Sequence, residues 1–174
     1  FVIGYDRAYN RWDPQAQRFA EPFDPAHLVN PSPNNTGLRE LPPAHRPLIA
    51  YPYGVSEEFP VLSSGGRMAD GGPVYRRADF APNAPRPWPA YFEGKWLVVD
   101  FVRNWIMAVA MDGTSGKVTA VERFVPDERF FSPIDVKFGP DGAMYVLDFG
   151  QLVMKNGHPS VKTGSGKIFR LTAT

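Results

Sequence analysis

Two short apolar stretches along the chain have nearly the same pattern of residues. Residues 96–101 read WLVVDF, and residues 144–149 read MYVLDF. Each stretch follows a glycine-containing turn and ends in an aspartate and a phenylalanine. Runs of β-branched and aromatic residues between turn formers are typical of β-strands. The sequence therefore predicts two equivalent strands at these positions.

The regions around this pair contain further candidate strands. The pattern predicts strands at 105–111 and 167–171, one after each copy, and others at 70–76 and 47–51. A group of strands that repeats every 40 to 50 residues or so is typical of the blades of a β-propeller. Chance similarity between two buried strands is the alternative, and the matching turns before both copies count against it. We expect an all-β chain.

Asp100 and Asp148 stand at the same position of the two copies, in otherwise apolar strands. A carboxylate at such a position must be hydrogen-bonded or paired, because an isolated buried charge is costly. We expect both aspartates to have structural roles, either capping a turn or pairing with a neighbouring sheet.

The first 47 residues are polar and rich in proline, with the densest turn signals at 30–38. The sequence predicts a long loop or insertion over 1–47 and a single incomplete domain of propeller blades over 48–174. At about 48 residues per unit, the second region amounts to about three blades. Three blades cannot close a ring. We therefore expect their open edges to pack against further blades, in the same polypeptide or in another chain.

Composition excludes several classes of function. The 19 Lys and Arg residues nearly balance the 18 Asp and Glu residues, so no strong field favours nucleic acid or anionic membranes. Because the chain has no run of about 18 apolar residues, no membrane span is predicted. The absence of cysteine excludes disulfides and thiolate zinc sites within this sequence. The 19 prolines and 16 glycines follow no collagen-like period and indicate turns between short strands.

Several ordered segments resemble the soluble glucose/sorbosone (aldose sugar) dehydrogenase family, whose catalytic domain is a six-bladed β-propeller. These segments are 71–75 (GGPVY), 91–100 (YFEGKWLVVD), 103–106 (RNWI) and 132–147 (SPIDVKFGPDGAMYVL). Segments 34–38, 41–44 and 51–54 are similar to a branch of the family found in large secreted bacterial proteins. The resemblance implies the C-terminal blades of a six-bladed propeller and a secreted or periplasmic location.

The resemblance also implies a chemistry. Family members use pyrroloquinoline quinone, often with calcium, to oxidise sugars, while a histidine takes the proton and cationic side chains hold the carboxylates of the cofactor. The implied function is a sugar (aldose-type) oxidoreductase with a small sugar substrate and with pyrroloquinoline quinone and calcium as candidate cofactors. None of His27, His45 and His158 stands in the family's catalytic motif. No catalytic residue is therefore assigned within this segment.

One segment departs from the family's pattern. Quinone-binding members carry Arg-x-Arg-Asp at the entry to the last blade, whereas residues 132–135 of this chain read SPID. Two of the cations that hold the cofactor are therefore missing. This difference favours an alternative function, a non-catalytic β-propeller that serves as a binding or assembly module in an extracellular complex. The sequence leaves both functions open.

Four residues are candidates for a cofactor site. Arg103 and Asn104 follow a predicted strand, in a loop where side chains can bind a sugar hydroxyl or a carboxylate. Asp135 begins a predicted inner strand, where a carboxylate needs a partner or a metal. Arg67 follows two glycines and could hold an anion beside exposed amides. The structural alternatives are a salt bridge between blades for Arg103, a paired carboxylate for Asp135 and a solvated turn for Arg67.

Overall fold

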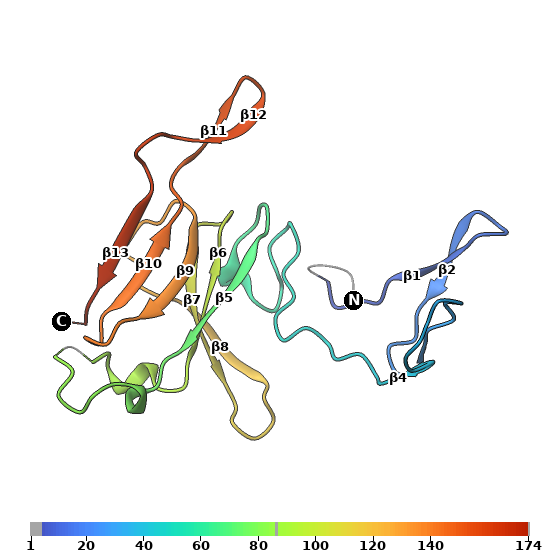
Figure 1. Ribbon diagram of the computed structural model, residues 1–174, viewed down its shortest axis with the longest axis horizontal. Helices are drawn as coiled ribbons and strands as arrows, with labels where there is room; N and C mark the ends of the chain where they lie inside the picture. Colours follow the sequence, from blue (N-terminus) through green and yellow to red (C-terminus); the bar gives the residue numbers. More distant parts are fainter. Residues whose placement is uncertain (1–4, 86, 174) are drawn as a thin grey trace. The chain divides into compact units, whose positions relative to one another are not determined.

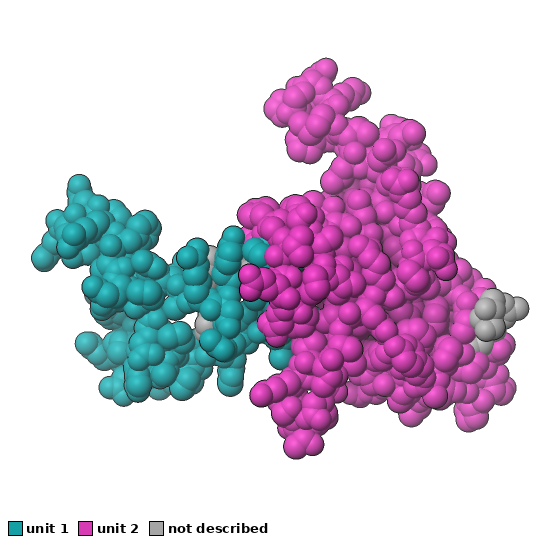
Figure 2. Space-filling model, turned by 180° about the vertical axis from the view of Figure 1, so that it is seen from behind, with its two compact units in different colours: residues 1–52 teal, residues 53–174 magenta. Residues whose placement is uncertain are grey.

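The computed structural model describes residues 5–85 and 87–173 and shows an all-β protein (Figure 1). Its strands form antiparallel sheets, and none of these sheets closes on itself. The chain divides into two compact units, residues 1–52 and 53–174, which are coloured separately in Figure 2. The prediction of an all-β chain is confirmed.

The first unit contains two small hairpins, which the sequence analysis did not predict. Their strands are β1 (Asn10–Asp13), β2 (Arg18–Pro22), β3 (Leu28–Val29) and β4 (Glu40–Leu41), and β1 pairs with β2 and β3 with β4. The Asp13 carboxylate closes the first turn by accepting hydrogen bonds from the amides of Gln15 and Ala16. The side chains of these strands are mostly exposed, so local turn chemistry shapes this unit more than a core does.

The strand predicted at 47–51 is wrong, since these residues form no strand. Pro47 has no amide hydrogen, and a second proline follows directly at position 52. Proline cannot donate to a sheet ladder, so the prolines at its two ends weaken this short stretch as a strand. Residues 53–68 also contain no strand and include the short 3₁₀ helix η1 (Pro60–Leu62). Two larger sheets therefore occupy the region where about three blades were predicted.

The second unit is built on those two sheets. The first has the order β5 (Ala69–Val74), β6 (Trp96–Asp100), β7 (Trp105–Met111), β8 (Val118–Arg123). The second has the order β9 (Pro133–Phe138), β10 (Met144–Asp148), β13 (Lys167–Leu171). The hairpin of β11 (Leu152–Lys155) and β12 (His158–Val161) projects from the second sheet, and the 3₁₀ helices η2 (Arg77–Asp79) and η3 (Ala90–Phe92) precede β6 (Figure 1). The strands predicted within these two sheets are confirmed, with small shifts at their ends.

The two sheets repeat each other strand by strand, with β5, β6 and β7 matching β9, β10 and β13. Val98 pairs with Met107 in the first sheet, and Val146 pairs with Phe169 at the same place in the second. The loop before the third strand spans 101–104 in the first sheet and 149–166 in the second. The longer loop accommodates the β11–β12 hairpin. The likeness between 96–101 and 144–149 is thus a structural repeat.

Asp100 and Asp148 perform the same task in the two copies. One oxygen of Asp100 accepts from the amides of Val102 and Arg103 in the following turn, at 2.8 and 2.7 Å, and the other accepts from Met68, just before β5. Asp148 likewise accepts from Gly150 in its own turn and from Phe131, just before β9. Both carboxylates are buried. The expectation that each caps a turn is confirmed.

The two sheets pack face to back. We call the face that carries Val99 in the first sheet and Leu147 in the second the front face, and the opposite face the back face. The core joins Val99 and Ile106, on the front of the first sheet, to Met144 and Val146, on the back of the second. The contact therefore joins the front face of one copy of the repeat to the back face of the other copy.

Candidate functional site

Arg103 lies in the turn between β6 and β7 and holds a distant loop. Its Nε donates to the carbonyl of Gly66 at 2.9 Å, and its terminal nitrogens donate to the carbonyls of Leu62, Ser63 and Gly65 at 2.7–3.1 Å. A guanidinium carries five N–H donors in a fixed plane, so it can gather several carbonyls of a curved loop at once. The observed role of Arg103 is therefore to fasten residues 62–66 to the first sheet.

Asn104 follows directly and has a left-handed backbone conformation, with φ of 59°. Asparagine tolerates this region better than most residues because its short side chain bonds locally. With the side-chain amide oriented to donate, its nitrogen reaches the carbonyls of Phe101 at 3.2 Å and Phe131 at 2.8 Å. Since Phe131 lies just before β9, Asn104 connects the first sheet to the second.

The other two predicted site residues also contact neighbouring side chains. The Arg67 guanidinium lies 4.0 Å from the centre of the Tyr53 ring, a cation–π geometry. Asp135 lies on β9, opposite Leu147, and its carboxylate is 3.2 Å from the ammonium of Lys137. That ion pair is well exposed, so it contributes little to stability. The structure gives the four candidate residues separate partners and does not gather them around one ligand.

These contacts bear on the predicted cofactors. A quinone with several carboxylates needs cationic donors directed at one place, whereas Arg103 directs four donors at main-chain carbonyls and Arg67 stacks on a ring. These two arginines do not fit the role of holding the cofactor. Calcium requires six to eight oxygen ligands or so, most often with several carboxylates among them. The described part of the chain holds no cluster of three or more His, Cys, Asp or Glu residues suited to a metal ion.

The front face of the second sheet is the surface that residue-by-residue motif reading missed. Leu147 and Ile168 are paired across β10 and β13 and are 41% and 72% exposed. Their counterparts Val99 and Ile106 are paired in the same register in the first sheet and are only 0% and 1% exposed. With Phe149, the two exposed residues line a shallow apolar hollow. The signal that could have revealed this surface was the repeat itself.

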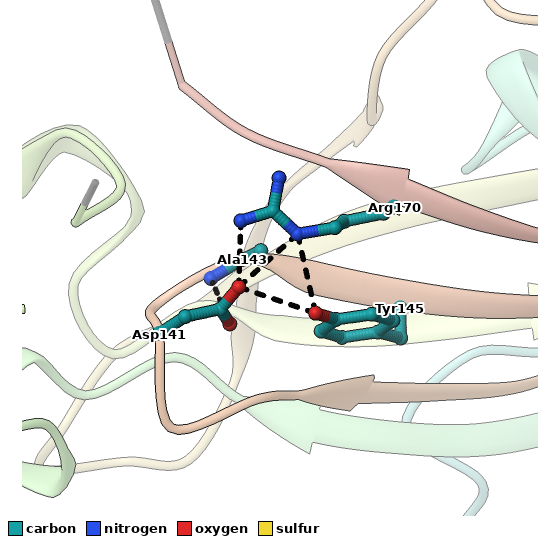
Figure 3. A network of polar contacts seen from close by, with 4 residues as sticks. All are labelled: Asp141, Ala143, Tyr145 and Arg170. Atoms are coloured by element: carbon teal, nitrogen blue, oxygen red, sulfur yellow. Dashed lines mark hydrogen bonds and ion pairs between the residues drawn. The ribbon is translucent and has the colours of Figure 1, made fainter. Parts of the chain in front are cut away.

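A polar network lies next to this apolar area on the same face, because Tyr145 and Arg170 are paired two residues along from Leu147 and Ile168. Figure 3 shows its residues. The Asp141 carboxylate accepts from both Nη2 and Nε of Arg170, at 2.6 and 3.1 Å, and from the hydroxyl of Tyr145 at 3.1 Å. The amide of Ala143 donates to its other oxygen. The hydrogen bonds from Arg170 above all hold the pKa of Asp141 below its ordinary value. The front face thus combines an apolar centre with a charged border.

Comparisons with models of protein families, with curated proteins and with solved structures found no match for this chain. The likeness to sugar dehydrogenases is therefore an expectation from sequence motifs. No helix within residues 5–85 and 87–173 is long and apolar enough to cross a membrane. The front face of the second sheet is the candidate site that the geometry itself supports.

Proposed function

We propose that this chain is an assembly module of the β-propeller type, in which the two sheets are blades and the second sheet receives a further sheet on its front face. The observation that carries the proposal is the exposure of Leu147 and Ile168 at positions where Val99 and Ile106 are buried. Burying one such side chain stabilises a contact by about 1.5–3 kcal/mol. Two neighbouring side chains on a flat strand face therefore favour a partner surface.

The packing of the two sheets supports a particular kind of partner. The front face of the first sheet packs on the back face of the second. Such a contact between two different faces leaves the front face of the last sheet open, and further sheets can add until a ring forms or another surface covers that face. The next element in the series presents an apolar back face like that of the second sheet, where Met144 and Val146 lie in the core. An apolar centre with a polar border is also the usual composition of a protein interface.

This proposal corresponds to the binding or assembly module, rather than to the sugar oxidoreductase, of the two functions that the sequence left open. The contacts of Arg67 and Arg103 favour it, because both cations serve the fold of residues 53–66. Secretion, a sugar substrate and a quinone cofactor stay predictions from the family resemblance.

The front face can be tested with one substitution and a matched control. Leu147→Lys places a charge in the apolar hollow, whereas Met154→Lys changes a more exposed apolar residue on β11, outside the sheet. The unsubstituted chain is expected to bind the dye ANS and to self-associate with rising concentration in sedimentation experiments. Leu147→Lys should abolish both, and Met154→Lys neither. A chain that stays monomeric and dye-free at all concentrations contradicts the proposal.

The two functions can be separated by adding the cofactor. The purified chain is mixed with pyrroloquinoline quinone and calcium, and bound quinone and sugar-dependent dye reduction are measured. The assembly function predicts that no quinone stays with the protein after gel filtration. Quinone that is retained by the chain and lost in Arg103→Gln would favour the oxidoreductase instead.

A further inference from the structure

We propose that the β11–β12 hairpin binds the surface of a bilayer that contains anionic lipid. One face of the hairpin contacts the acyl chains, and the lysines of its other face reach the lipid phosphates. The hairpin contributes no residue to the apolar hollow on the front face of the second sheet. This inference therefore goes beyond the assembly function and does not depend on it.

The hairpin has a fixed register and therefore two distinct faces. Its turn is formed by Asn156 and Gly157, which both have positive φ, 52° and 78°, as tight two-residue hairpin turns require. The turn sets Lys155 opposite His158, and the antiparallel ladder continues from this pair along both strands. Successive side chains of a strand point to opposite faces, so alternate residues of the hairpin share a face.

One face of the hairpin is an apolar strip. The strip consists of Leu152, Met154, Pro159 and Val161. Leu152 is paired with Val161 and Met154 with Pro159, so the four side chains are contiguous. Leu152 and Met154 are 43% and 70% exposed, and the hairpin projects from the second sheet (Figure 1). Transfer of such side chains from water to an apolar medium is favourable.

The opposite face is mainly polar and carries Val153, Lys155, His158 and Ser160. Lys162 extends this face, because its amide donates to the carbonyl of Gln151 at 2.9 Å and so continues the ladder. Residues 149–169 include three lysines and no acidic residue, although acids and bases nearly balance over the whole chain. None of the ion pairs formed among the described residues includes Lys155 or Lys162. The hairpin is therefore a local cationic patch that complements an anionic surface.

The separation of apolar and basic residues onto opposite faces favours lipid over a protein partner. An amphipathic element in the bilayer surface places its apolar face among the acyl chains, while lysines of the polar face extend their long stems to the phosphates. A protein interface instead surrounds an apolar centre with a polar rim on the same surface. Lys155 and Lys162 lie on the face opposite the strip. The open edges of the hairpin stay in the hydrated headgroup layer, where water satisfies their backbone groups.

Co-sedimentation of the purified chain with lipid vesicles tests binding. One set of vesicles is phosphatidylcholine alone, and the other contains equal parts of phosphatidylcholine and phosphatidylglycerol. We expect the chain to sediment with the anionic vesicles only, and less of it as salt is added, because mobile ions screen the lysines. A chain that stays in solution with both sets overturns the inference and leaves the apolar strip to a protein partner.

A pair of variants tests the apolar strip. Met154→Lys places an ammonium in the strip and should weaken binding to the anionic vesicles at least about tenfold, since the burial of one apolar side chain is lost. Met68→Lys is the matched control, because Met68 is 57% exposed and lies just before β5, away from the hairpin. It adds the same charge and should bind no more weakly than the unsubstituted chain. Equal binding by the two variants overturns the inference.

The lysines are tested by removing their charge. The double variant Lys155→Gln and Lys162→Gln keeps the strip and the register of the hairpin. It should bind the anionic vesicles at least about tenfold more weakly, because each lysine near an anionic surface contributes to binding. Its binding should also depend less on salt. Binding equal to that of the unsubstituted chain overturns the inference.

A single label distinguishes the two faces of the hairpin. The chain has no cysteine, so an introduced one carries a fluorescent dye at one position only. Met154→Cys labels the apolar strip, and Ser160→Cys labels the opposite face of the same hairpin. With anionic vesicles that carry nitroxide quenchers on their acyl chains, the dye at position 154 should be quenched strongly and the dye at position 160 weakly. Equal quenching at both positions overturns the inference.

The outcome is separable from that of the assembly function. Leu147→Lys alters the front face but not the hairpin, so it should lose self-association and still bind the anionic vesicles. If Leu147→Lys abolishes self-association while the unsubstituted chain fails to bind these vesicles, only the membrane inference is overturned. If the vesicles are bound while Leu147→Lys self-associates normally, only the assembly function is overturned.

Discussion

In the first sheet of unit 2, Val99 and Ile106 lie beneath the second sheet, and β8 flanks the third strand. In the second sheet, Leu147 and Ile168 occupy the same positions on the open front face, and β13 is an edge strand. The register of the second strand with the third and the buried aspartate are the same in both. The comparison shows that one local design can be either an interior or a surface, depending on what packs against it.

The largest expected effect comes from placing the same charge at the two matching front-face positions. Val99→Lys buries an ammonium without a partner, and such a group costs several kcal/mol, so the chain should fail to fold cooperatively. Position 147 is exposed and lies opposite Asp135, so Leu147→Lys should change the free energy of unfolding by no more than about 0.5 kcal/mol. Urea denaturation followed by circular dichroism compares the two. Similar losses in both variants would mean that the front faces are not in different environments.

Replacing the buried aspartate should also destabilise the chain more in the first sheet than in the second, but the difference in free energy should be smaller. Asp100 accepts three backbone hydrogen bonds and Asp148 accepts two. These hydrogen bonds to a carboxylate are part-buried, except the buried one from Gly150, and each contributes about 1.5 kcal/mol. Asp100→Ala should therefore reduce the free energy of unfolding by about 4 kcal/mol and Asp148→Ala by about 3 kcal/mol. A larger loss in Asp148→Ala would contradict this ordering.

The β11–β12 hairpin is the one insertion in the second sheet, and removing it sharpens the comparison. Replacing residues 149–166 with a short turn like 101–104 shortens the loop, and the entropy of loop closure then favours the folded state by about 1 kcal/mol. Thermal unfolding should shift upwards by a few degrees. A chain that no longer folds would show that the hairpin belongs to the core of the sheet.

The smallest effect concerns the Asp141 network, which has no counterpart in the first sheet. Because hydrogen bonds from Arg170 lower the pKa of Asp141 in the folded chain, its contribution is present above the unfolded pKa of about 3.9 and is lost as pH falls through the lower folded value. Asp141→Asn lacks this contribution. The two urea midpoints should differ slightly at pH 7, and the difference should shrink steadily as the pH is lowered below about 3.9. A difference that does not shrink as the pH falls contradicts the assignment.

Much of the second unit was readable from the sequence, and the reason is local. Residues 96–101 and 144–149 each follow a glycine-containing turn, hold β-branched or aromatic residues and end in Asp-Phe, and this pattern needs no distant partner to be recognised. The segments that were missed have weaker patterns. β8 is half exposed and mixes charged with apolar residues, and the hairpins of the first unit consist mainly of exposed side chains. The strand expected at 47–51 shows the reverse error, because an apolar run alone does not ensure that a neighbouring strand lies beside it.

The candidate site residues make contacts that a local stretch of sequence cannot predict. Arg103 stands in a loop suited to a ligand, yet its acceptors are carbonyls of residues 62–66, far earlier in the chain. Residue type and spacing do not reveal a contact of that range, since it exists only once the chain has folded back on itself. The same holds for Asn104, whose amide reaches Phe131 of the next sheet.

The sequence by itself determined that this protein repeats a β-sheet unit, with an aspartate ending the second strand of each copy at positions 100 and 148. The tertiary structure alone decided which copy is covered. Val99 and Leu147 are interchangeable as strand residues, and only the packing of one sheet on the other makes the first a core residue and the second a surface residue. Burial is a property of neighbours in space, and neighbours that are distant in sequence are not encoded in a local pattern.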